Sequence, residues 1–87
     1  MLSTNDMRAL ELLCQGGRWS AGEIEAQLRG TIAGAKPAMA RLPGLVNRGL
    51  ADVEADGYGV TPDGLTAYSR AVTAAYGPFA SLPAVQP

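Results

Sequence analysis

Apolar residues recur at steps of three and four along this chain, the spacing that gathers them on one face of a helix. In chain order they form four sets: Met7, Leu10, Leu13 and Cys14; Ile24 and Leu28; Met39, Leu42, Val46 and Leu50; and Leu65, Tyr68, Val72 and Tyr76. Glycines and polar residues separate the sets. The pattern therefore predicts helical segments that each bury one face in a common core.

Short polar residues mark where the first two helices begin. Ser3, followed by Asp6, offers a side-chain oxygen to the free amides of a first helical turn. Ser20 and Glu23 form a capping box, in which the serine reaches forward and the glutamate reaches back. Between the two helices, Arg18-Trp19 is either a very short strand or an extended link. The glycines after each apolar set end the helices, because glycine accepts the left-handed conformation of a C-terminus.

The third apolar set is interrupted. Pro37 suits the first turn of a helix. Pro43, however, lies well inside the pattern, where a proline removes a hydrogen bond and costs ~3 kcal/mol or more. We therefore expect a kink or two short helices, over 36–42 and 44–49, with Gly49 as the stop.

The stretch that follows changes to the alternation of a half-buried strand. Ala51 to Glu54 alternates with Val53 directed inward, and Tyr58 to Val60 is the return strand. Between them, Asp56-Gly57 is the preferred pair for a tight hairpin turn. A threonine and a proline then start the last helix.

Composition limits the class of protein. The chain has 87 residues, 47% of them hydrophobic and 17% charged, which fits one small folded domain rather than a disordered chain. No apolar run is long enough to cross a bilayer, and the first residues lack the pattern of a secretion signal. A single cysteine excludes an internal disulfide, and the lack of histidine argues against a zinc site. We expect a cytoplasmic protein with no metal and no cofactor.

An enzyme is not expected. Without histidine the chain has no imidazole base. Cys14 lies on an apolar stripe, which favours a core residue over a nucleophile. Glu23 and Glu25 are two residues apart on a helix and point to different faces, so they cannot act as a carboxylate pair.

Charge is distributed unevenly. Residues 18–50 hold five bases against two acids, whereas residues 51–64 hold four acids and no base. Such a distribution can steer a charged partner even when the net charge is only −1.

The order of elements and three motifs resemble the winged helix-turn-helix fold of small bacterial regulators such as the MarR, ArsR and PadR groups. Residues 20–28, SAGEIEAQL, resemble the support helix. Residues 42–50, LPGLVNRGL, resemble the end of the recognition helix, and residues 58–65, YGVTPDGL, resemble the exit from the wing. The resemblance implies a mostly helical α+β fold: a three-helix core, a wing of two or three short strands, and a C-terminal helix. This domain would span 1–76, with 77–87 as an extended or disordered proline-rich tail.

The resemblance implies double-stranded DNA as the partner, with the third helix (36–49) reading the major groove. Lys36 and Arg41 would lie on or near the groove side, and Ala40 can touch a thymine methyl. The expected DNA-binding residues are Arg18, Arg29, Thr31, Lys36, Ala40 and Arg41. A homodimer is also expected, because winged-helix regulators pair through their first and last helices. Its interface would be Leu65, Tyr68, Val72 and Tyr76.

A second interpretation stays open at this point. The expected wing carries Glu54 and Asp56, which repel phosphate, and the third helix offers few side chains that distinguish bases. A winged-helix domain that binds protein instead of DNA, as a small inhibitor, adaptor or assembly factor, fits these departures.

Overall fold

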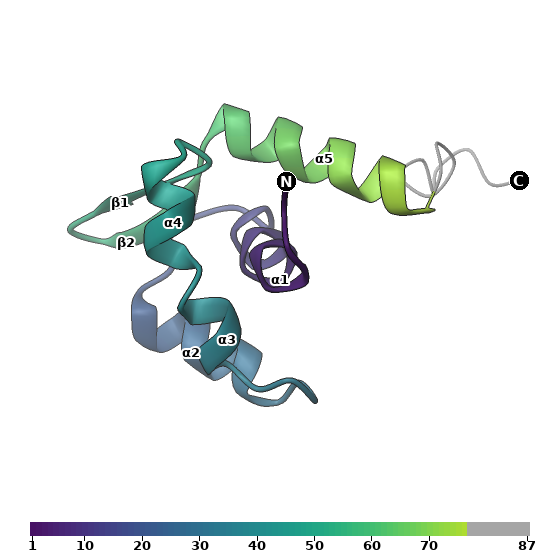
Figure 1. The fold of residues 1–87 in the computed structure, drawn as a ribbon. Coiled ribbons are helices and arrows are strands. Elements are labelled where there is room, and N and C mark those ends of the chain that lie inside the picture. The colour runs from purple at the N-terminus through teal and green to yellow at the C-terminus, as the bar shows by residue number, and fades with distance from the viewer. Residues whose placement is uncertain (77–87) are drawn as a thin grey trace, which may run out of the picture.

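The computed structural model describes residues 1–76. Its elements are α1 (Thr4–Leu13), α2 (Ala21–Arg29), α3 (Lys36–Met39), α4 (Leu42–Asn47), β1 (Ala51–Glu54), β2 (Gly57–Val60) and α5 (Pro62–Tyr76). In Figure 1, α1 is seen end-on at the centre, α2 and α3 lie below it, and α5 runs above it. The fold is α+β and mostly helical, as the sequence predicts. The expected tail, 77–87, lies outside the described residues.

The first two helices begin where the capping residues predict. The hydroxyl of Ser3 accepts from the amide of Asp6 at 3.1 Å, and the amide of Ser3 donates to the Asp6 carboxylate at 2.9 Å. Ser20 and Glu23 make the same pair of bonds at 3.1 and 2.8 Å. These reciprocal bonds satisfy amides that a helix start leaves without partners.

The third helical segment is divided in two, as Pro43 and Gly44 predict. The break falls around Ala40 and Arg41, earlier than expected, and α3 has only four residues. Pro43 lies in the first turn of α4, where its missing amide leaves no hydrogen bond unmade. The proline therefore starts the second short helix rather than ending the first.

The strands form an antiparallel hairpin with Ala51 opposite Val60 and Val53 opposite Tyr58. The extended link before α2 joins this hairpin at one residue: Trp19 and Tyr58 exchange both backbone hydrogen bonds, at 2.9 and 2.8 Å. The prediction that Val53 points inward is wrong, since this residue is 52% exposed. Only the Ala51 end of β1 reaches the core, and Figure 1 shows the turn projecting away from the helices.

The core forms around α1. Leu10 and Leu13 of α1, Ile24 of α2 and Leu45 of α4 have no exposed surface. Partly buried side chains surround this centre, and the half-buried Tyr68 attaches α5 to it. No helix within residues 1–76 is long and apolar enough to span a membrane.

Candidate nucleic-acid interface and the arginine–carboxylate clusters

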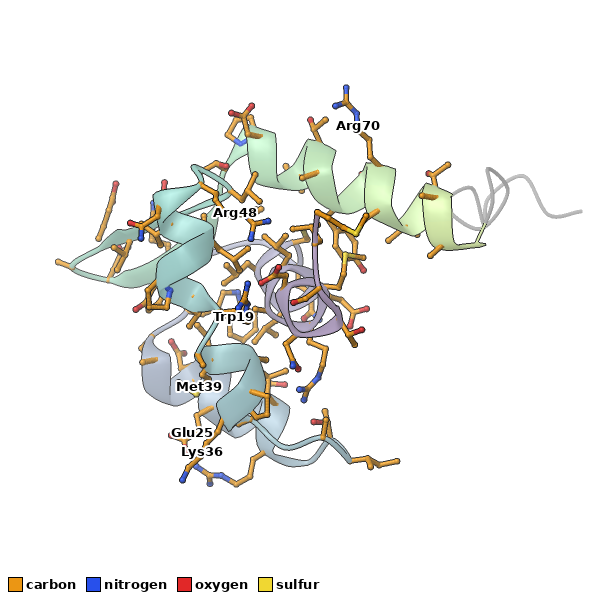
Figure 2. All side chains as sticks on the ribbon, in the orientation of Figure 1. Trp19, Glu25, Lys36, Met39, Arg48 and Arg70 are labelled. Atoms are coloured by element: carbon orange, nitrogen blue, oxygen red, sulfur yellow. The ribbon has the colours of Figure 1, made fainter. Side chains whose placement is uncertain are left out.

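Four of the residues expected to bind DNA lie exposed around the turn between α2 and α3: Arg29, Thr31, Lys36 and Ala40. Figure 2 shows Lys36 at the lower end of the molecule, far from Arg70. The ammonium of Lys36 has no hydrogen bond or ion pair to any of residues 1–76. The Arg29 side chain is 70% exposed and lies 3.7 Å from the Glu25 carboxylate, a loose surface pair. Both cations are therefore accessible to an anionic partner.

Thr31 has a structural role in this turn. Its hydroxyl donates to the carbonyl of Leu28 at 2.7 Å and accepts a bond from Arg8 of α1. Arg8 also donates to the carbonyl of Gly34, a residue with φ of 77°. The guanidinium of Arg8 thus fixes the turn against α1, and it sets the direction in which α3 leaves the turn.

Arg18 is directed to the hairpin. Its guanidinium lies 2.7 Å from the Asp52 carboxylate, 3.5 Å from that of Glu54 and 3.6 Å from that of Asp56. The hydrogen bond with Asp52, supported by the charges of the other two acids, raises the pKa of Arg18. One cation faces three carboxylates, so this cluster has a net charge of −2 and the hairpin stays acidic.

The lack of a side chain on Gly59 leaves room for the Arg18 guanidinium. A Cβ on Gly59 would lie 3.3 Å from the Arg18 guanidinium carbon and from the Asp52 carboxylate. The carbonyl of Gly57 accepts a bond from Arg18 at 3.0 Å. The guanidinium therefore lies against the backbone of β2, on the face of the hairpin that carries the acids.

A second cluster joins α1 to α4 through Asp6, which is 1% exposed. The Nε of Arg41 donates to one carboxylate oxygen at 2.6 Å, and a terminal nitrogen of Arg48 donates to the other at 3.3 Å. Burial by itself would raise the pKa of Asp6. The bonds from Arg41, the Ser3 backbone and Arg48 outweigh that effect and lower the pKa to about 2. Asp6 is therefore an ionised carboxylate shared by two arginines.

Sequence reasoning missed this cluster. It placed Asp6 only at the start of α1, and Arg48 was not among the residues expected to bind a partner. Arg41 was expected to bind DNA, and its side chain is 46% exposed although its Nε is held by Asp6. In the sequence, Arg41 lies 35 positions after Asp6, and Arg48 lies 42 positions after it. No local pattern indicates that such distant residues meet.

The residues expected at a dimer interface lie along α5. Leu65 is 46% exposed, whereas Val72 is half-buried. Tyr68 packs against the core, and its hydroxyl donates to Glu11 of α1 at 3.3 Å. The side chain of Tyr76 lies outside the described residues. Of the described members, Leu65 presents the most apolar surface.

Neither a metal centre nor a reactive thiol emerges from residues 1–76. No group of three or more histidine, cysteine, aspartate or glutamate side chains within this range could hold a metal ion. Burial and the nearby charge of Glu11 raise the pKa of Cys14, which keeps its thiol protonated.

These features define a small α+β domain with an accessible cationic end and an acidic hairpin. No protein-family model, curated protein or solved structure matches this chain. Its function is therefore argued from the geometry.

Proposed function

We propose that this protein is a winged-helix DNA-binding regulator that contacts double-stranded DNA through the end of α2, the following turn and α3. The observation that carries the proposal is the pair of accessible cations at this end, Arg29 and Lys36, with Arg41 half-exposed where α3 meets α4. Phosphate neutralisation by such side chains dominates the affinity of most DNA-binding proteins. Ala40 lies between Lys36 and Arg41 in the sequence, and its exposed methyl group suits contact with a thymine methyl.

The order of elements supports the same proposal. Before α2 begins, Trp19 pairs with Tyr58 of the hairpin. The hairpin itself follows directly after α3 and α4. This is the order in which a winged-helix domain presents its recognition helix and its wing. In this proposal the hairpin stays away from the DNA backbone, because its net charge of −2 after pairing with Arg18 would repel phosphate.

The test compares Lys36→Gln with Arg70→Gln by fluorescence anisotropy on duplex DNA over a range of salt concentrations. Lys36 and Arg70 are both exposed, and neither side chain has a hydrogen bond or ion pair to another described residue. Each substitution therefore removes one accessible positive charge. We expect Lys36→Gln to bind roughly five- to tenfold more weakly and to show a salt slope smaller by about 1. Arg70→Gln should keep the wild-type slope.

Absence of wild-type binding even at low salt would contradict the proposal. An equal loss in both variants would show a general charge effect rather than an interface at α3.

One observation favours a second function, a module that binds another protein. The hairpin exposes Val53 at 52%, on the face opposite to the one that carries Asp52 and Glu54. An exposed apolar side chain on a hairpin whose other face is acidic suits a basic protein surface better than it suits DNA. If the wild-type protein fails to bind DNA, the hairpin becomes the proposed site and another protein the proposed partner.

A further inference from the structure

The Asp6 cluster carries more positive charge than its structural role requires. One arginine neutralises one carboxylate, yet Asp6 is shared by Arg41 and Arg48, so the cluster has a net charge of +1. Asp6 is buried, but the side chains of Arg41 and Arg48 are 46% and 37% exposed. The excess charge therefore lies at the surface.

Both guanidiniums also keep unused donors. Arginine has five N–H donors in a rigid fork. Asp6 takes the Nε of Arg41 and one terminal nitrogen of Arg48, and neither guanidinium has another hydrogen-bond partner among residues 1–76. A carboxylate that holds an arginine by its Nε fixes the plane of the fork and leaves the two terminal nitrogens for another oxyanion.

We propose that Arg41 and Arg48 together bind one phosphate group, and that Asp6 is the positioning residue that holds them. Planar forks with fixed orientation bind phosphate through paired N–H···O bonds, which a flexible lysine cannot reproduce. This inference rests on the proposed function, and there the occupant is a phosphate of the DNA backbone. Arg48 thereby extends the contact along α4, beyond the end of the molecule that carries Lys36.

The position of Arg48 provides a matched control. Figure 2 shows Arg48 on the side of α4 that faces α1, whereas Arg70 extends from α5 away from the body of the molecule. Arg48→Gln and Arg70→Gln each remove one positive charge, but only the first touches the Asp6 cluster. Asp6 keeps its shorter bond, from Arg41, in the Arg48 variant, so the variant is expected to fold. A thermal melt checks this.

The first experiment measures DNA affinity against salt for the wild type and both variants. We expect Arg48→Gln to weaken binding roughly five- to tenfold and to reduce the salt slope by about 1, the value for one lost phosphate contact. Arg70→Gln should keep the wild-type slope. If the wild type binds DNA and the two variants behave alike, this inference is overturned while the proposed function stands.

The second experiment does not depend on DNA. Inorganic phosphate is titrated into the wild type at constant ionic strength, and the Nε–H resonances of the arginines are followed by NMR. Saturating shifts at Arg41 and Arg48, but not at Arg70, support the site even if the wild type binds no DNA. Unchanged resonances, or equal shifts at all three arginines, overturn it.

Discussion

At the residue scale, the buried Asp6 joins segments that are far apart in the sequence. It caps α1 through Ser3 and holds Arg41 and Arg48 of the segment that contains α4. A carboxylate that is 1% exposed would be strongly destabilising without these partners. Three donors instead stabilise its charged form, which ties the start of the chain to the middle.

The lowered pKa of Asp6 predicts a dependence of stability on pH. Its folded pKa, about 2, lies below 3.8, the ordinary pKa of an aspartate. The unfolded state therefore binds more protons in this range, and stability falls as the pH falls. Between pH 5 and pH 2 the wild type should lose about 2 kcal/mol more than Asp6→Asn, which cannot titrate. Urea unfolding at each pH measures the difference.

Asp63→Asn is the matched control for this prediction, because Asp63 is an exposed carboxylate in the first turn of α5. Its unfolding is measured over the same pH range, to separate the loss of a surface carboxylate from the loss of the buried one. A parallel decline of stability in the wild type and Asp6→Asn would show that the bonds to Asp6 do not stabilise its charge.

At the element scale, glycines decide how closely neighbouring segments approach. Gly64 is buried in α5, and a Cβ there would overlap the carbonyl oxygen of Leu50 just before β1. That carbonyl also accepts the amide of Thr61 at 3.2 Å. The start of α5 therefore rests directly on the chain that enters the hairpin, and only a residue without a side chain fits.

Two alanine substitutions separate close packing from helix propensity. Gly64→Ala should destabilise the fold by roughly 3 kcal/mol, because a backbone carbonyl must move to admit the methyl group. Gly44→Ala lies in α4, where the new Cβ has open space, and should stabilise the fold by up to about 1 kcal/mol. Chemical unfolding measures both changes. Equal effects of the two substitutions would contradict the close approach at Gly64.

At the scale of the whole molecule, some positive charges pair with carboxylates inside the fold and others stay accessible at the surface. Arg18 is directed to the hairpin acids, and Asp6 holds Arg41 and Arg48 at the junction of α1 and α4. Figure 2 shows Lys36 at the opposite end from Arg70, and the exposed Arg29 is the last residue of α2. A nearly neutral chain can thus present accessible cations at one end and an acidic projection elsewhere, a distribution that can steer a charged partner.

A homodimer through α5 stays a prediction at this scale. Leu65 is 46% exposed in the first turn of α5, so Leu65→Lys should spare the fold while placing two like charges at a symmetric interface. We expect dimerisation to weaken roughly tenfold or more. Sedimentation velocity over a range of concentrations measures it. A wild type that sediments as a monomer throughout would contradict the prediction.

The positions of the helices and strands follow from the sequence, because the signals for them are local. These signals are the capping pairs, the apolar steps of three and four, and the Asp56-Gly57 turn. Each depends on residues no more than four positions apart. The helices and the hairpin consequently lie where the pattern predicts. The displaced break between α3 and α4 shows the limit of such signals, since a proline can end one helix or start the next.

Which charged side chains stay accessible depends on how the elements pack together. The exposure of Val53, the direction of Arg18 and the pairing of Arg41 and Arg48 with Asp6 depend on segments that meet across as many as 42 positions. A charged side chain has the same identity in the sequence whether it faces solvent or a buried carboxylate. Its availability is set by its neighbours in space, and these exist only once α1, α4 and the hairpin are packed together.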